Sequence, residues 1–385
     1  MSVCILGIGT AVPELSIEQA EAAEAAGILC GLTEKQRRLL PTLYRHAGVR
    51  KRHTVLLTPE ANGNPGGQVF YRSVDEGGPN GPSTGARMQK YAASATGLAT
   101  TACSRALTDA SIDASAITHL ITVSCSGFAA PGVDIQLIRE LGLPPEVART
   151  HVGFMGCHGA LNGLRVARAF ADANPEARIL VCAIELCSLH HQYGWNPEQI
   201  VANALFADGS AAVVCGHVSS RAGDEKPRWL SSGSMVVPQT EDLMSWNIGD
   251  FGFQMTLSPR VPDAIQSSLR NWLESWLASE GIDLSEIAHW GIHPGGPRIL
   301  QACIDALQLE PSAIQTSRDV LAEFGNMSSP TILFITERLI RNETPGPCVL
   351  LAFGPGLTIE AALVEPSVRQ SSGKVRREKA AIGSA

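Results

Sequence analysis

Residues 152–164 read Val-Gly-Phe-Met-Gly-Cys-His-Gly-Ala-Leu-Asn-Gly-Leu, the most informative stretch of the chain. An apolar segment broken by glycines leads into Cys157, and apolar residues then recur at helical spacing up to Phe170. The thiol is therefore expected at a helix start, where unpaired N–H groups and the helix dipole favour the nucleophilic thiolate. Gly156 and Gly159 leave room for a substrate carbonyl, as acyl transfer requires. A buried, unreactive cysteine at a tight turn explains the same pattern.

Two later segments carry further candidate groups. Residues 288–297 contain a short apolar run that ends at His293, before a proline and two glycines, which predicts an imidazole on a loop after a strand. Residues 324–330 contain a Gly-Asn turn at Asn326 before a helical run. Each segment alone is weak, because a lone histidine is more often a core residue and Gly-Asn is more often only a turn. Together with Cys157 they supply the nucleophile, base and amide donor of acyl-transfer chemistry.

These motifs, in this order and spacing, resemble the type III polyketide synthases, also called the chalcone synthase family. The resemblance extends from about residue 1 to residue 365. Its motifs are Gly156-Cys157, Ile-His-Pro-Gly-Gly-Pro at 292–297, Gly-Asn-Met-Ser-Ser at 325–329, Phe-Gly-Pro-Gly-Leu-Thr-Ile-Glu at 353–360, Leu-Phe-Ala-Asp-Gly-Ser-Ala-Ala at 205–212, and Ser126-Gly127 followed by Pro131-Gly132.

The resemblance implies a reaction and a role for each residue. Cys157 is expected to attack an acyl-CoA thioester and to carry the acyl group, while His293 sustains the thiolate as an ion pair. His293 and Asn326 are expected to hydrogen-bond the thioester oxygen of malonyl-CoA, which stabilises the enolate left when carbon dioxide departs. The extended chain then cyclises to a pyrone, resorcinol or related aromatic polyketide. The family also implies a homodimer, in which residues 128–132 reach the partner's cavity.

The predicted pocket departs from the plant enzymes of the family. Cys125 and Cys187 stand where the plant enzymes carry Thr, and Trp246 falls roughly where they have Gly. Such a lining suits an alkyl chain better than a phenolic starter, so the chain is expected to be nearest to bacterial alkylpyrone and alkylresorcinol synthases. If Trp246 blocks the tunnel instead, only short starters or malonyl-CoA fit. The predicted pocket residues are Phe206 as gatekeeper, Met255, Cys125, Cys187, His190, Trp246, Ser328 and Pro355.

CoA needs cations for its phosphates at the mouth of the tunnel. Arg45 and Arg50 lie in a basic segment where the family has CoA-contacting Lys and Arg, and we predict that they bind the diphosphate and the 3′-phosphate. A solvated helix end explains the same charges.

Composition excludes several other functions. The chain has 385 residues, 44% apolar content and a formal charge of −7, which offers no basic face for nucleic acid. Its 10 cysteines show no C-x-x-C pair or metal-ligand spacing, so we expect no metal and no cofactor, the CoA thioesters being substrates. Free cysteines, no evident signal peptide and no apolar run of about 20 residues favour a cytoplasmic protein without a membrane span.

Strand and helix patterns alternate along the chain, which predicts an α/β fold with helices on the faces of parallel strands. The resemblance narrows this to the thiolase-like layered αβαβα fold with two similar, pseudo-duplicated halves. We expect an N-terminal half at 1–220 with the nucleophilic Cys, a C-terminal half at 229–366 with the His and Asn, and a disordered tail at 367–385. The expected strands are 3–9, 119–124, 179–185, 211–216, 288–292, 348–353 and 357–363; the helices are 17–26, 33–47, 96–110, 262–279, 297–307 and 329–341; residues 59–85 form a loop.

Other classes stay open at this point. A type III β-ketoacyl synthase of fatty-acid synthesis shares the fold and a Cys-His-Asn set, but is expected to carry a basic patch for acyl carrier protein. A degradative thiolase needs a second reactive cysteine near the C-terminus, for which Cys348 is the candidate. A non-catalytic homologue is expected to lose part of the triad, and all three residues are present.

Overall fold

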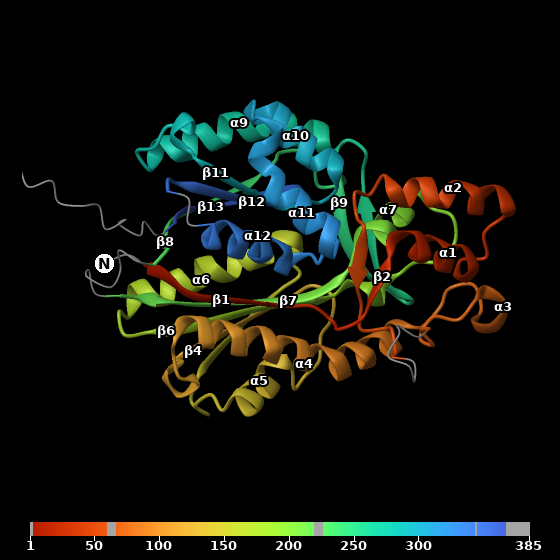
Figure 1. The fold of residues 1–385 in the computed structure, drawn as a ribbon, viewed down its shortest axis with the longest axis horizontal. Coiled ribbons are helices and arrows are strands. Elements are labelled where there is room, and N and C mark those ends of the chain that lie inside the picture. The colour runs from red at the N-terminus through yellow and green to blue at the C-terminus, as the bar shows by residue number, and fades with distance from the viewer. Residues whose placement is uncertain (1–2, 60–66, 219–225, 343–344, 367–385) are drawn as a thin grey trace, which may run out of the picture.

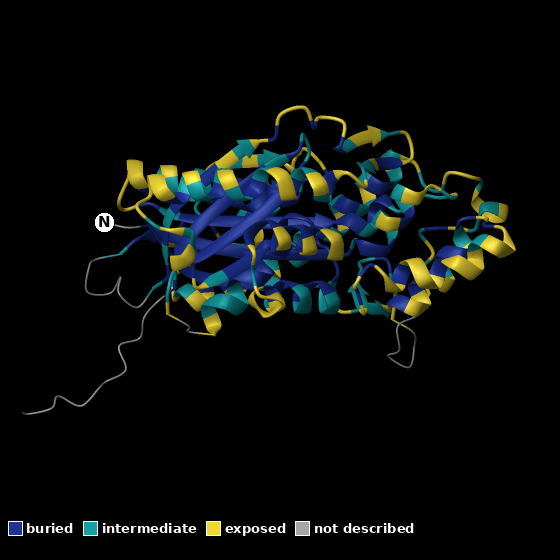
Figure 2. Ribbon diagram, turned by 90° about the horizontal axis from the view of Figure 1, so that it is seen from above, coloured by how far each residue is buried: buried dark blue, intermediate teal, exposed yellow. Residues whose placement is uncertain are grey.

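The computed structural model describes residues 3–59, 67–218, 226–342 and 345–366. Its elements stack in five layers, helices alternating with sheets, and the first and last layers are helical (Figure 1). Figure 2 shows the buried strands in the middle and the exposed residues on the outer helices. The predicted layered α/β fold is therefore confirmed. The tail at 367–385 lies outside the described residues.

Five strands of the N-terminal half form one sheet layer, in the order β1-β7-β6-β4-β5. β4 is parallel to β5 and β6, whereas β7 is antiparallel to β6 and β1. All of them except the edge strand β5 are almost continuously buried, as expected where helices cover both faces of a sheet. The bounds are β1 Val3–Ala11, β4 His119–Ser124, β5 Ala148–Gly153, β6 Arg178–Leu186 and β7 Asp208–His217.

Four strands of the C-terminal half form the second sheet layer, in the order β11-β12-β13-β8. β11 and β12 are parallel, and β13 is antiparallel to both β12 and β8. Two residue pairs between β1 and β8, Val3 with Trp229 and Cys4 with Arg228, join the two layers into one nine-stranded sheet. The bounds are β8 Arg228–Val236, β11 His289–Ile292, β12 Cys348–Gly354 and β13 Thr358–Glu365.

Helices α6 and α12 lie between the sheet layers, and others cover the outside (Figure 1). The first turns of the central helices α6 and α12 are wholly buried, because both faces of these helices meet a sheet. α4 and α5 cover the N-terminal sheet, and α9 and α10 cover the C-terminal sheet. The bounds are α4 Thr84–Ala110, α5 Val133–Leu141, α6 Gly159–Ala173, α9 Val261–Ser279, α10 Pro297–Leu307, α11 Gln315–Phe324 and α12 Ser329–Arg341.

Smaller elements gather at one end of the layers (Figure 1). The hairpin of β9 and β10 packs beside α7, and α1 and α2 pack on the other side of α7. The bounds are β2 Ser16–Glu18, α1 Gln19–Leu29, α2 Glu34–Arg45, β3 Lys51–His53, α3 Val74–Gly77, α7 Pro197–Leu205, β9 Met244–Gly249 and β10 Gly252–Leu257.

The sequence-based boundaries differ from the structure at several points. The helix expected at 96–110 begins at Thr84, because the Ser83 side chain accepts a hydrogen bond from the Ala86 N–H and caps it. The loop expected at 59–85 contains the short helix α3, and its residues 60–66 lie outside the described part. The expected helices at 297–307 and 329–341 match α10 and α12. Among the helices of the described residues, none is both long and apolar enough to cross a membrane.

Candidate active site

Cys157 lies where a strand of the first sheet layer gives way to the central helix α6. It occupies a single 3₁₀ turn, Gly156–His158, directly before α6, and Gly156 there has a φ of 73°. This φ suits glycine, since it lies in the left-handed region. A Cβ on Gly156 would also lie 2.4 Å from Cδ of Pro355. The predicted placement of the thiol at a helix start is what the structure shows.

The environment of Cys157 favours the neutral thiol. The side chain is 9% exposed, and burial raises its pKa to about 11. Hydrogen bonding by Ser328 and Asn326 lowers the pKa, and the Glu185 carboxylate raises it. Burial is the largest of these effects because a thiolate loses its hydration there.

His293 follows β11, and its N–H donates to the Leu351 carbonyl at 2.8 Å. The side chain is 1% exposed, and neither ring nitrogen has a hydrogen-bond partner among the described residues. Burial, and then the charge of His158, lower the pKa of His293 to about 3. The pKa shifts of Cys157 and His293 each favour the neutral group, and the thiolate–imidazolium pair stays a prediction. Both groups are expected to be neutral, and the two ring nitrogens are left for a reacting molecule.

Asn326 lies between α11 and α12, and backbone contacts fix it. Its N–H donates to the Leu205 carbonyl at 2.8 Å, and its own carbonyl accepts from Ala207 at 2.9 Å. The side-chain Oδ1 accepts from the Ser328 N–H at 2.8 Å. This bond assigns the amide orientation, so the Nδ2 donor is left for the sulfur of Cys157.

The backbone around Asn326 also holds the gatekeeper. Phe206 forms an isolated parallel bridge with Asn326, and the guanidinium of Arg52 donates to the Phe206 carbonyl at 3.1 Å. Arg52 also donates to the Asn203 carbonyl. Arg52 lies two residues after Arg50 in the basic segment, but it is half-buried and its bonds hold the part of the chain that carries Phe206.

A cavity of about 390 Å³ surrounds the thiol. Of the eight predicted pocket residues, the structure places seven here, the exception being His190. His190 lines a neighbouring cavity of about 940 Å³ that extends towards α1 and shares four lining residues with the first. Its Nε2 bonds the Ser126 carbonyl at 2.7 Å, its Nδ1 accepts from the Phe253 N–H, and its ring stacks on Phe253. The seven residues at the thiol cavity are Phe206, Met255, Cys125, Cys187, Trp246, Ser328 and Pro355.

Glu185 is a lining residue that the sequence reasoning missed. It is fully buried at the end of β6 and accepts from both the Cys125 and Ser126 N–H groups and from the Ser126 and Ser329 hydroxyls. Burial raises its pKa and these donors lower it. An acidic residue within an apolar strand pattern is the signal that could have found it.

A third cavity, of about 1030 Å³, lies on the other side of α7, between the end of α2 and residues 295–299. Neither Arg45 nor Arg50 lines it. Arg45 bonds the Thr42 hydroxyl, and a nitrogen of Arg50 lies 4.0 Å from a Glu323 oxygen. The arginine that does line this cavity is Arg298, which directly follows the Gly295-Gly296-Pro297 motif.

One alternative class, a degradative thiolase, needs a second reactive cysteine, and Cys348 does not supply it. Cys348 is buried within β12 and, unlike Cys157, lines none of the three cavities. The ten cysteines all lie in described parts of the chain, and each is buried.

The fold, with the Cys157 thiol at the start of a buried helix and the Asn326 amide beside it, defines a thiolase-like condensing enzyme, and comparisons with known proteins identify its family. Two family models match the chain, "Chalcone and stilbene synthases, N-terminal domain" at residues 2–218 and "Chalcone and stilbene synthases, C-terminal domain" at residues 229–368. The chain belongs to this family and is a type III polyketide synthase, an acyltransferase. The matches give no support to a fatty-acid synthase assignment.

Several bacterial relatives match along almost the whole chain. The chain is 32% identical to the Mycobacterium tuberculosis protein "Alpha-pyrone synthesis polyketide synthase-like Pks18", over 94% of this chain and 90% of the relative. It is 33% identical to 1,3,6,8-tetrahydroxynaphthalene synthase of Streptomyces peucetius subsp. caesius, over 94% and 92%. The crystal structure of PKS-I from the brown alga Ectocarpus siliculosus superposes with a TM-score of 0.88 at 28% identity, covering 95% of this chain and 98% of that one.

Proposed function

We propose that this synthase loads a fatty acyl-CoA starter on Cys157, extends it with malonyl-CoA and cyclises the product to an alkylpyrone or alkylresorcinol. The observation that carries the proposal is the convergence of the thiol, the Asn326 amide and an apolar cavity that opens towards a larger one. CoA thioesters are the substrates, and no further cofactor is needed for the chemistry.

Loading begins with proton transfer from the Cys157 thiol to a ring nitrogen of His293, since both groups are neutral beforehand. The thiolate attacks the thioester carbonyl of the starter, a new C–S bond forms, and CoA leaves as its thiolate. The proton held by His293 passes to that leaving group. The acyl group then remains as a thioester on Cys157.

Extension follows in the same cavity. The carboxylate of malonyl-CoA leaves as carbon dioxide, and its bonding electrons form an enolate whose oxygen is stabilised by donors from His293 and Asn326. The enolate carbon attacks the acyl thioester on Cys157, the C–S bond breaks, and the thiolate is released. The lengthened β-ketoacyl-CoA can return to Cys157 for a further round. We propose two or three such rounds.

The polar atoms around the cavity favour an alkyl starter, because many of them are already bonded within the protein. The indole Nε1 of Trp246 donates to the Cys125 carbonyl at 2.8 Å. Both ring nitrogens of His190 bond the backbone. Few donors or acceptors remain for a phenolic hydroxyl, whereas apolar surface of an alkyl chain gains about 0.8 kcal/mol for each methylene buried.

The CoA moiety is proposed to occupy the third cavity. Arg298 lines this cavity, the predicted Arg45 lies on α2 near the lining residue Leu43, and Arg50 follows that helix. Arginine suits phosphate groups because its fork of N–H donors matches their oxygens. We propose that these cations bind the diphosphate and the 3′-phosphate.

We also propose that the protein assembles as a cytoplasmic homodimer. A second proposal is that residues 1–220 and 229–366 are related by duplication. Phe128 and Phe154 stack with ring centroids 5.1 Å apart, and both are 36% exposed beside the edge strand β5. Exposed aromatic rings next to an unpaired strand edge favour pairing with a second copy. Each proposed half supplies one of the two sheet layers.

Replacing the nucleophile tests the proposal. Cys157→Ala is expected to abolish acyl-enzyme formation from a fatty acyl-CoA, as measured by intact-protein mass spectrometry. Cys157→Gln is expected to retain decarboxylation of malonyl-CoA without condensation, because that half-reaction needs His293 and Asn326 but no thiolate. An acyl-enzyme that still forms on the Cys157→Ala variant would show that another residue is the nucleophile.

A further inference from the structure

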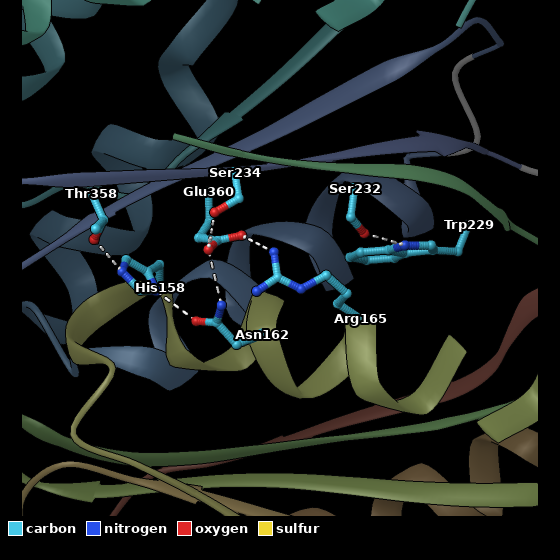
Figure 3. A network of polar contacts seen from close by, with 8 residues as sticks. All are labelled: His158, Asn162, Arg165, Trp229, Ser232, Ser234, Thr358 and Glu360. Atoms are coloured by element: carbon cyan, nitrogen blue, oxygen red, sulfur yellow. Dashed lines mark hydrogen bonds and ion pairs between the residues drawn. The ribbon is translucent and has the colours of Figure 1, made fainter. Parts of the chain in front are cut away.

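A buried polar network begins at His158, the residue directly after the nucleophile (Figure 3). Its imidazole is 2% exposed and bonds at both nitrogens, Nδ1 to Oδ1 of Asn162 at 2.6 Å and Nε2 to Oγ1 of Thr358 at 2.5 Å. His158 and Asn162 are one helical turn apart, whereas Thr358 comes from β13 in the other half of the chain. The ring therefore connects the nucleophile turn to the second sheet layer.

The Glu360 carboxylate terminates the network and fixes its direction. It accepts from Asn162 Nδ2 at 3.0 Å, from the Ser234 hydroxyl at 2.8 Å and from the Arg165 guanidinium at 2.8 Å. A carboxylate accepts only, so the amide nitrogen of Asn162 must face Glu360, and its oxygen must face His158. The Nδ1 of His158 consequently carries a proton.

The other nitrogen of His158 then accepts. Thr358 has a single hydroxyl proton, which can go to His158 Nε2 at 2.5 Å or to the Pro355 carbonyl at 3.1 Å. Burial lowers the pKa of His158 and so favours the neutral ring, although Asn162 and Glu360 act in the opposite direction and Arg165 in the same one. In the neutral ring, the Thr358 hydroxyl donates to Nε2.

Packing ties the same ring to the wall of the active site. A Cβ on Gly354 would lie 2.4 Å from both Cδ2 and Nε2 of His158, so the imidazole rests against the backbone just before Pro355. Pro355 lines the thiol cavity and contacts Gly156 on the other side of Cys157. The turn that carries the thiol is thus held from both sides by the connection between β12 and β13.

We propose that His158 is a positioning residue for Cys157, locked by Asn162 and Glu360 in a single tautomer so that the nucleophile turn is fixed against the β12–β13 connection. The inference rests on the proposed role of Cys157 as the nucleophile and adds a group whose two ring nitrogens are both bonded within the protein. Keeping the ring neutral also serves His293, because the charge of a protonated His158 lowers the pKa of His293.

Asn162→Leu tests the network with little change in volume. It removes both bonds of the amide and leaves the His158 N–H without its acceptor, so loading of a fatty acyl-CoA on Cys157 is expected to fall about 10- to 100-fold. Decarboxylation of malonyl-CoA does not use the thiolate, and we expect its rate to change less than twofold between Cys157→Gln and the Cys157→Gln/Asn162→Leu double variant.

Asn162→Asp is expected to change the pH dependence of loading, which a loss of packing alone would not change. A protonated Asp reproduces both bonds, with its carbonyl accepting from His158 and its O–H donating to Glu360. Two adjacent buried carboxyls hold a shared proton at low pH and release it as the pH rises. The loading rate of this variant, divided by that of the wild type, is expected to be near one at pH 6 and to fall at least fivefold by pH 9.

Ser234→Ala is a further variant, which removes one donor to Glu360, and Ser232→Ala is its matched control. Both serines lie on β8, but Ser232 bonds the Trp229 indole, whereas Ser234 donates to Glu360 (Figure 3). We expect Ser234→Ala alone to slow loading. A wild-type loading rate in folded Asn162→Leu, or a pH-independent rate ratio for Asn162→Asp, would overturn the inference. A failure of the proposed function would give a different result, namely an acyl-enzyme that still forms on the Cys157→Ala variant.

Discussion

Trp246 stands at the junction of two cavities, and replacing it should change the length of starter that the enzyme accepts. The residue lines both the cavity of about 390 Å³ around the thiol and the neighbouring one of about 940 Å³. Its indole donates to the Cys125 carbonyl, and its ring contacts His190 and Phe253 with centroids 5.3 and 5.8 Å away. Trp246→Gly removes this partition and should join the two cavities.

The magnitude follows from the apolar surface that the longer chain buries. Each methylene contributes about 0.8 kcal/mol, which is about fourfold in kcat/KM, so a step of two carbons is worth about 15-fold. In the wild type, kcat/KM is expected to rise by this factor along a series of saturated acyl-CoA starters until the chain reaches the indole. In Trp246→Gly the rise should continue for longer chains, and the optimum should move by at least two carbons.

The assay is the steady-state rate of product formation with malonyl-CoA, with products identified by mass spectrometry. Loss of a fully buried Trp costs about 3–5 kcal/mol and Trp246 is half-buried, so thermal unfolding of each variant must be measured alongside. Trp272→Ala is a control, because Trp272 stacks on Trp276 of α9 and lines none of the three cavities. An unchanged optimum in folded Trp246→Gly would refute the partition. A wild-type preference for p-coumaroyl-CoA over every fatty acyl-CoA would refute the alkyl starter.

Three further predictions address the thiol, the assembly and the active-site wall. Because burial raises the pKa of Cys157 to about 11 and lowers that of His293 to about 3, alkylation of Cys157 by iodoacetamide should accelerate with pH beyond pH 9; a plateau below pH 7 would instead indicate a thiolate–imidazolium pair. Light scattering should give about twice the chain mass of 40.7 kDa, and Phe128→Asp should shift the protein towards monomer; a stable, active wild-type monomer would contradict this. Gly354→Ala should lower the free energy of unfolding in urea by about 1–3 kcal/mol, since the new Cβ meets the His158 ring, and unchanged stability would mean that the contact is not tight.

The sequence by itself determined the class of fold, the family and the chemical types of the reacting groups. Strong local patterns made this possible. The helix at 297–307 starts with a proline and the helix at 329–341 has one near its start, and both keep an apolar face, so their bounds were predicted as observed. Cys157, His293 and Asn326 each lie within two residues of a glycine, in motifs short enough to be recognised without any knowledge of packing.

Only the tertiary structure decided which polar groups are free to act. His190 and Arg52 carry chemistry that the sequence could assign to a substrate or to CoA, yet both are occupied by backbone carbonyls of other segments. The partners of His158 and Glu185 include residues about 60 to 200 positions away along the chain. A local pattern shows which donors and acceptors a segment possesses. Burial, and the bonds made across distant elements, decide which of them remain unpaired and reactive.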